Sequence, residues 1–189
     1  MSRAVGIAAL VALGVAAAGA RPNPVVQLST TLGDITIELY PDKAPVTVEN
    51  FLAYVRAGYY DGTVFHRVVP NFIVQGGGLT PDLVERDGLR PPIRSESDNG
   101  LHNAAGTVGM ARTSAADSAR SQFFINAQDN AVLDRPRALD GVGYAVFGSV
   151  TAGMDVVHRI ERVKTTVRGP YANIPVEPVL LRSARIMQP

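Results

Sequence analysis

The sequence contains no cysteine, and this absence excludes several classes of chemistry before any motif is considered. Without a thiol there is no disulfide framework, no thiolate nucleophile, no cysteine-based metal site and no lipidated cysteine anchor. The stability of the fold must therefore come from packing.

Histidine is scarce as well, with only His66, His102 and His158 in the chain. No two of them are spaced as an i, i+4 pair and no HExxH motif occurs, so a metal site or hydrolytic triad could arise only by convergence of distant residues. We expect neither metal nor cofactor. The glycine run 76–78 is not followed by Lys-Ser/Thr, so we interpret it as a turn with unusual backbone angles rather than a phosphate-binding loop.

A strong excess of one charge is also missing. Eighteen Lys and Arg face 17 Asp and Glu, and no basic cluster is present that could follow a phosphate backbone, so nucleic acid is not an expected partner. Collagen-like periods, heptad runs and low-complexity tracts are likewise absent. The 18 glycines and 13 prolines are scattered, which favours many turns and short strands.

The N-terminus carries a short apolar run. Residues 4–18 are all Ala, Val, Leu, Ile or Gly, after Arg3 and before the small residues Ala18-Gly19-Ala20. This pattern predicts a secretory signal peptide over 1–20, because the run is shorter than the roughly 20 residues that span a bilayer. The alternative is an uncleaved anchor. In both cases the domain is exported, to the periplasm or beyond the cell, and after cleavage nothing ties it to a membrane.

The mature chain is predicted to consist of a short linker, 21–24, and a single all-β domain, 25–189. Alternating apolar residues in 34–40 indicate a half-buried strand. Val48, Phe51, Leu52 and Val55 fall at i, i+3, i+4 and i+7, which predicts a helix that starts near Pro45 and stops at Gly58. A second helix is expected near 152–162, and the polar segment 78–106 reads as a long loop, typical of functional segments. Many short strands without βαβ alternation predict a closed antiparallel β-barrel. The expected strands are 25–30, 34–40, 63–69, 72–77, 107–112, 122–126, 144–148 and 179–187.

Two segments carry residues that need an explanation. Arg67 lies among apolar residues of an expected strand, where an unpaired charge is costly; it is either paired with an acid or kept for function. Phe123 and Phe124 are adjacent on another strand and must point to opposite faces. The outward ring is covered either by a loop or by an apolar ligand.

Four blocks in this order resemble the signature segments of cyclophilins: FHRVVPNFIVQGGG (65–78), GTVGMART (106–113), SQFFINAQDN (121–130) and GYAVFG (143–148). The resemblance extends from about Val25 to Met187. Arg112, Tyr144 and the export signal make the chain most similar to the small periplasmic branch in bacteria. The resemblance implies an eight-stranded antiparallel barrel capped by two helices. It also implies a monomeric peptidyl-prolyl cis-trans isomerase that acts on proline-containing segments of folding proteins without a cofactor.

The resemblance also implies a site on the outer wall of the barrel. Arg67 matches the catalytic arginine, beside a proline pocket and a stretch whose backbone pairs with the substrate. The residues at matching substrate-binding positions are His66, Phe72, Ile73, Gln75, Met110, Ala111, Arg112, Phe124, Leu133 and Tyr144.

This sequence departs from the family pattern at two positions. Val132 stands where relatives carry Trp or Phe at the pocket rim, and Ile73 stands where Met is usual. The missing ring is expected to open one wall and to weaken cyclosporin-like ligands. A non-catalytic proline-binding chaperone or scaffold is the alternative function, and a purely architectural barrel is a third.

Overall fold

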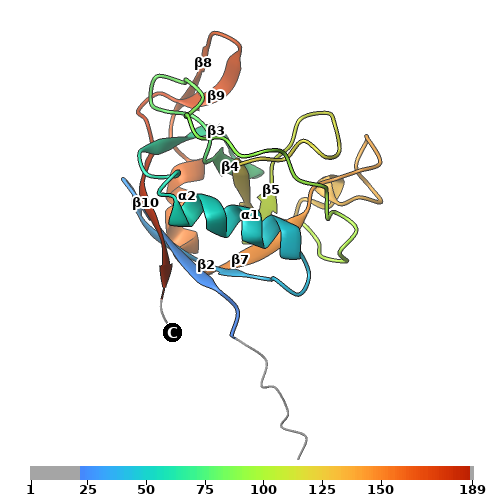
Figure 1. Cartoon of the computed structure of the whole chain (residues 1–189). Coiled ribbons are helices and arrows are strands. Elements are labelled where there is room, and N and C mark those ends of the chain that lie inside the picture. Colours follow the sequence, from blue (N-terminus) through green and yellow to red (C-terminus); the bar gives the residue numbers. More distant parts are fainter. Residues whose placement is uncertain (1–21, 188–189) are drawn as a thin grey trace, which may run out of the picture.

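The computed structural model describes residues 22–187 as a closed antiparallel barrel with the strand order β1-β10-β3-β4-β6-β5-β7-β2 (Figure 1). This confirms the predicted fold class, including its eight strands and two helices. The barrel strands are β1 (Val25–Thr30), β2 (Gly33–Leu39), β3 (Thr63–Val69), β4 (Ile73–Gly76), β5 (Thr107–Met110), β6 (Phe123–Asn126), β7 (Val146–Ala152) and β10 (Leu180–Met187).

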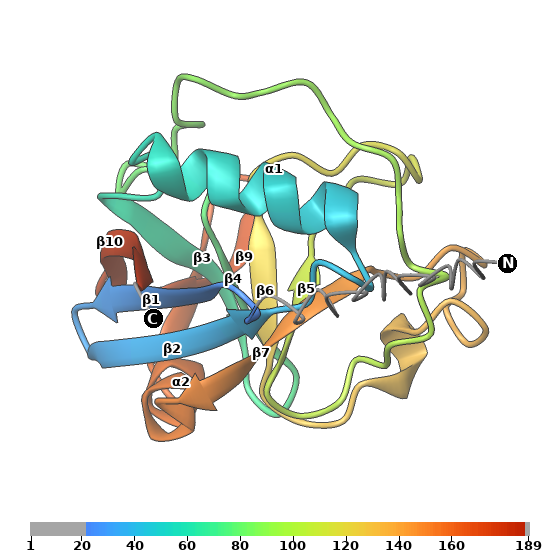
Figure 2. The same cartoon turned by 60° about the horizontal axis from the view of Figure 1, so that its bottom comes forward.

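The helices α1 (Pro45–Arg56) and α2 (Met154–Glu161) cover opposite sides of the barrel (Figure 2). Helix α1 begins with proline and buries the apolar residues at the expected spacing: Val48, Phe51, Leu52 and Val55. The buried carboxylate of Glu96 accepts hydrogen bonds from the backbone N–H groups of Val46 and Thr47, at 3.1 and 2.8 Å, and so satisfies donors that the first helical turn leaves free.

The barrel interior is filled by aromatic and aliphatic side chains from both helices and all parts of the sheet. The ring of Phe51 on α1 meets the ring of Phe123 on β6 edge-on, with centroids 5.5 Å apart. Since T-shaped contacts add to the free energy gained by burying the rings, this helix is fixed firmly against the barrel. The interior is therefore solid, and a substrate site has to lie on the outside.

A two-stranded sheet, β8 (Thr165–Arg168) and β9 (Tyr171–Pro175), is not hydrogen-bonded into the barrel but packs against β3, and it was not predicted. The prolines and glycine in 164–178 obscure two strands of only four and five residues. The 3-10 turn η1 (Ala131–Leu133) was also missed. The strand expected at 144–148 instead begins at Val146, because Gly143 (φ +69°) and Tyr144 complete the preceding loop.

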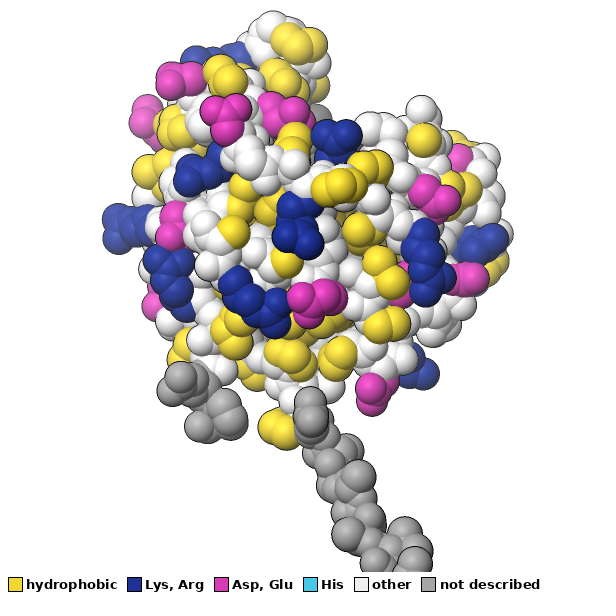
Figure 3. Space-filling model, in the orientation of Figure 1, with side chains coloured by type: hydrophobic (Ala, Val, Ile, Leu, Met, Phe, Trp, Pro, Cys, Tyr) yellow, Lys and Arg dark blue, Asp and Glu magenta, His cyan; other side chains and the backbone are white. Residues whose placement is uncertain are grey.

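The predicted signal peptide lies outside the described residues, as does the first residue of the linker. Between residues 22 and 187 no helix has both the length and the apolar character needed to cross a membrane. The face seen in Figure 3 carries basic and acidic side chains interspersed among apolar ones. That face offers no field of a single sign.

Candidate active site

Four residues on neighbouring strands form a row across the outer wall of the barrel. Arg67 on β3 pairs with Gln75 on β4, Gln75 pairs with Phe124 on β6, and Phe124 pairs with Gly109 on β5. The next row along the same strands, which includes Val68 and Ile125, is fully buried in the core. Because successive residues of a strand point to opposite faces, the pleat turns the first row outward.

A β-bulge at His66 makes this arrangement possible. Phe65 pairs with Gly76 and Arg67 pairs with Gln75, so His66 is an extra residue on β3. In a regular strand Arg67 would share a face with Phe65, whose ring belongs to the core. The bulge shifts the alternation and delivers the guanidinium to the outer face instead.

Arg67 is half-buried and is not used in an ion pair. Its Nη1 donates a long hydrogen bond of 3.4 Å to Oε1 of Gln75. No carboxylate within residues 22–187 lies within salt-bridge distance of its guanidinium. A guanidinium has five N–H donors, so most of them are available to a ligand. The sequence left two explanations for Arg67: an ion pair with an acid, or a functional role. The described part of the chain shows no such ion pair.

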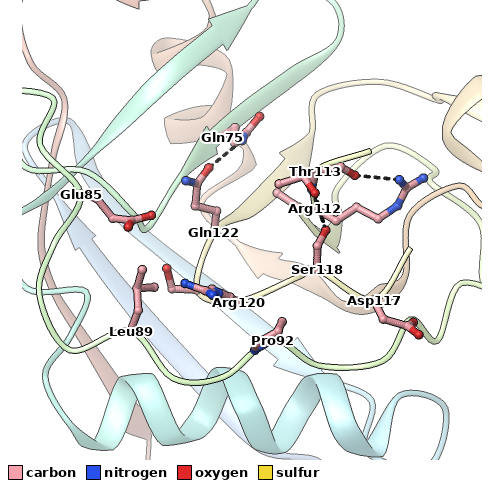
Figure 4. A pocket seen from close by; sticks show the side chains of 12 residues that line it. Gln75, Glu85, Leu89, Pro92, Arg112, Thr113, Asp117, Ser118, Arg120 and Gln122 are labelled. Atoms are coloured by element: carbon pink, nitrogen blue, oxygen red, sulfur yellow. Dashed lines mark hydrogen bonds between the residues drawn. The ribbon is translucent and has the colours of Figure 1, made fainter. Parts of the chain in front are cut away.

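Gln122 extends the polar side of the site, although the sequence analysis did not select it. Its Oε1 accepts a hydrogen bond of 3.0 Å from Nε2 of Gln75, which turns the other end of the Gln75 amide toward Arg67 (Figure 4). The signal that could have found it is its position two residues before Phe124, on the same outward face as that ring.

His66 lies behind this polar group and is 6% exposed. Its Nδ1 has no hydrogen-bond partner among the described residues. Burial lowers the pKa of His66, because a charged imidazolium is poorly solvated there, and the charge of Arg67 lowers it further. His66 is therefore a neutral ring at physiological pH.

The apolar side of the site begins at Phe124. Phe123 enters the core and Phe124 faces outward, as predicted, but the outward ring is only 2% exposed. The ring of Tyr144 covers it in a T-shaped contact with centroids 5.6 Å apart. The outward Phe is therefore covered by the loop before β7. Ile73 is nearly buried, while Phe72 and Leu133 are half-buried and leave apolar surface for a ligand.

A hydrogen-bond network fixes the two half-buried apolar residues. The side-chain amide of Asn130 donates to the carbonyl of Phe72 and to Oδ1 of Asn126, at 2.8 Å each. The backbone N–H of Leu133 donates to the carbonyl of Asn130, also at 2.8 Å. Asn130 thus ties the residue before β4 to the η1 turn, so that the pocket wall is preorganised.

Arg112 has a buried side chain, 3% exposed, that supports the site from behind. Its guanidinium lies over the Tyr144 ring at 4.6 Å, donates to the carbonyl of Gly143 at 2.8 Å and pairs with Asp140. The hydrogen bond from Arg112 holds the pKa of Asp140 far below its usual range. The Arg112 side chain is thus occupied, so the predicted pairing with the substrate backbone is left to the main chain of Ala111 and Arg112.

Met110 does not lie in the groove where the resemblance placed it. Its side chain is 2% exposed and belongs to the core of the barrel. The reason is the alternation on β5, which points Val108 and Met110 inward on either side of Gly109. The Met110 side chain therefore cannot contact a substrate in the groove, and its predicted place among the substrate-binding residues was wrong. The other nine substrate-binding residues selected from the sequence, together with Arg67, lie in or directly behind the outer wall.

A cavity of about 340 Å³ opens beside Gln75 and Gln122, away from the apolar wall (Figure 4). The long loop 78–106 supplies one side of it through Glu85 and Leu89, and Ala111 and the residues after it supply the other. The long loop therefore does take part in the site. Within residues 22–187 no cluster of three or more metal-ligating side chains is found.

The family model described as cyclophilin type peptidyl-prolyl cis-trans isomerase/CLD matches residues 25–185. Peptidyl-prolyl cis-trans isomerase A of Dickeya dadantii is 50% identical over 163 residues, covering 86% of this chain and 84% of its own. Peptidyl-prolyl cis-trans isomerase B of Escherichia coli is 45% identical over 165 residues, covering 87% and 100%. A crystal structure of a cyclophilin type isomerase from Cryptosporidium parvum has a TM-score of 0.72 at 24% identity, covering 88% and 99%.

Proposed function

The chain belongs to the cyclophilin-type peptidyl-prolyl cis-trans isomerases, which bind proline-containing peptides and accelerate rotation about the Xaa-Pro bond, and we propose that Arg67 is the group that drives this rotation. The single observation that carries the proposal is the half-buried guanidinium of Arg67 on the outer wall, which has no acid partner in the described part of the chain and lies beside apolar side chains.

The reaction requires stabilisation of a twisted amide and no bond cleavage. Delocalisation of the nitrogen lone pair into the carbonyl gives the peptide bond a rotational barrier of roughly 18–20 kcal/mol. Uncatalysed prolyl bonds exchange over about 10–100 s. Reaching about 10³ per second requires roughly five decades of acceleration, or about 7 kcal/mol off the barrier.

Arg67 can supply a large part of this stabilisation. As the amide twists, the proline nitrogen becomes pyramidal and regains a basic lone pair, which a guanidinium N–H can bind. The planar ground state offers no such acceptor, so the interaction is confined to the transition state and raises kcat. A charge-assisted hydrogen bond in a partly dry groove contributes several kcal/mol. The hydrogen bond to Gln75 keeps the guanidinium in this orientation.

The apolar wall holds the proline ring while the rest of the peptide rotates. Phe72 and Leu133 present the exposed apolar surface, backed by Ile73, Phe124 and Tyr144. The main chain at Ala111 and the residue after it, together with the Gln75 amide, anchors the flanking carbonyls. The ring and one flank are thus fixed, and only the prolyl bond turns.

Replacement of Arg67 tests the mechanism. Arg67→Ala should lower kcat by about a hundredfold to a thousandfold with KM little changed, because the lost interaction exists only in the transition state. Arg67→Lys keeps the charge but loses the planar fork, and should restore little. Arg56→Ala, which removes an exposed arginine of α1, is the matched control and should retain full activity. The measurement is prolyl exchange in a peptide followed by NMR.

Equal rates for wild type and Arg67→Ala would show that the cation does no catalysis. The alternative, a proline-binding module without turnover, would then describe the chain better. The structure gives that module less support, since burying a proline ring does not need a free guanidinium.

We further propose that the protein is exported and acts as a monomer on segments of folding proteins. The apolar run after Arg3, the small residues at 18–20 and the small domain support this. N-terminal sequencing of the protein from cells should find a mature end after residue 20, and size-exclusion chromatography should give a monomer mass. Retention of residues 1–20 on membranes would favour the anchor instead.

A further inference from the structure

The β8–β9 hairpin brings a second group of side chains to Arg67, on the flank away from the apolar wall. A cavity of about 420 Å³ lies there, lined on the barrel side by Arg67, Gln75 and Gln122 and on the outer side by Pro170, Tyr171 and Ala172. No residue of the proline-binding wall takes part in it. The hairpin therefore closes one flank of the same groove in which the prolyl bond turns.

The hairpin is held firmly in this position. Figure 1 shows it projecting from the end of the barrel above β3, and Ile174 of β9 is 3% exposed. Pro81 and Leu83 from the long loop line a small cavity together with Ile174 and Arg168 of the hairpin. A two-residue turn, with Gly169 at φ +57°, joins Arg168 to Tyr171. The tip is thus a short, anchored turn, which fixes the position of the Tyr171 ring.

We propose that Tyr171 and its neighbours at the hairpin tip form a specificity subsite for an apolar, preferably aromatic, side chain next to the proline of the substrate. The proposal rests on the proposed function, because it takes Arg67 as the centre of the reaction. The subsite is continuous with that centre through Arg67 and Gln75, which line both.

The chemistry of the lining selects this class of side chain. The half-buried Tyr171 ring, Pro170 and Ala172 supply apolar surface at the outer wall, and Leu79 adds to it from the barrel side. Proline and tyrosine rings pack well against a flat side chain at little cost in conformational entropy. The charges at the cavity are opposite in sign, Arg67 and Glu85, so neither a basic nor an acidic side chain gains a clear advantage.

The experiment compares two peptide series, Ala-Xaa-Pro-Ala and Ala-Ala-Pro-Xaa, with Xaa as Ala, Phe, Leu, Lys or Glu. Prolyl exchange is followed by NMR, which avoids the sequence preference of a coupling protease. In wild type we expect kcat/KM for Phe to exceed that for Ala by about fivefold in one of the two series, in keeping with a partly open apolar pocket. The series that responds identifies the flank.

Tyr171→Ala should remove this preference, so that the Phe and Ala peptides react with nearly equal kcat/KM. Tyr171→Phe should keep the preference, because the ring surface remains. Val167→Ala is the matched control: this residue of β8 is 69% exposed and does not line the cavity, so the variant tests the hairpin without touching the subsite.

A second variant keeps the test decisive if Tyr171→Ala disrupts the fold of the hairpin. Ala172→Asp replaces an exposed side chain at the same cavity and should turn the preference from Phe toward Lys. Wild-type Phe-to-Ala ratios in both Tyr171→Ala and Ala172→Asp would overturn the proposal, as would a wild-type preference for a charged residue. Failure of the subsite and failure of the Arg67 mechanism give different results. If only the subsite is wrong, Arg67→Ala still slows exchange in the all-Ala peptide; if the mechanism is wrong, Arg67→Ala is as active as wild type.

Discussion

Gly109 has no side chain, and the row of outward residues depends on that. The Phe124 ring lies directly against its backbone, so that a Cβ placed on residue 109 would sit 2.2 Å from Cζ and 2.7 and 2.8 Å from the two Cε atoms of Phe124. A contact of 2.2 Å must lengthen to at least about 3.4 Å, so in Gly109→Ala the ring has to move by roughly 1.2 Å.

The ring has little room for such a move. Phe124 is 2% exposed, with the Tyr144 ring against it in a T-shaped contact and Gln75 beside it in the sheet. Overpacking of this kind costs about 1–3 kcal/mol of unfolding free energy. A displacement of about 1 Å at a substrate-positioning group costs up to about a hundredfold in rate, so we expect kcat/KM to fall by about tenfold to a hundredfold.

The assay is prolyl exchange by NMR at fixed folded concentration, with the unfolding free energy from a urea titration. Gly100→Ala is the control for a loss of stability without a clash: it forces an alanine into a positive φ of +79°, which Gly109 does not have, and leaves open space around the Cβ. It should lose stability and keep its rate. Phe124→Leu removes the clashing ring atoms, so adding Gly109→Ala to it should cost much less than in the wild-type background. A Gly109→Ala enzyme with wild-type kcat/KM would refute the reasoning.

The remaining predictions concern the pH dependence of activity and of stability. We expect kcat/KM to be flat between about pH 6 and 8, since an arginine stays charged and the lowered pKa of His66 keeps its ring neutral; a bell-shaped profile that His66→Gln abolishes would instead implicate this imidazole in acid–base catalysis. The unfolding free energy should begin to fall as the pH drops below about 6.5, because the unfolded chain then binds a proton at residue 66 more readily than the folded protein. His66→Gln should remove that first decline in urea titrations across pH, while the later acid loss from Asp61 and Asp134, whose pKa values are also lowered, persists.

The strands and helices of the barrel could be read from the sequence because each has its own periodicity. The segment 63–69 was predicted with its observed bounds, and the first helix was found from the spacing of Val48, Phe51, Leu52 and Val55. The β8–β9 hairpin escaped because its strands are short, β8 is largely exposed, and the buried residues of β9, Ile174 and Pro175, are consecutive and show no alternating pattern. Tyr171, which it brings to Arg67, was therefore invisible as a site residue.

The site was less accessible to sequence reasoning than the fold, and β3 shows why. Strict alternation from the core residue Phe65 would point Arg67 into the interior, where burying an unpaired guanidinium costs too much free energy. The β-bulge at His66 places Arg67 on the outer face instead, but no feature of the local sequence predicts a bulge there. Deletion of His66 would make Phe65 and Arg67 neighbours on a strand without a bulge, and regular alternation would then also place Phe65 inside the barrel and Arg67 outside. The bulge is therefore what keeps Phe65 in the core and Arg67 on the outer wall although the two residues stand two positions apart.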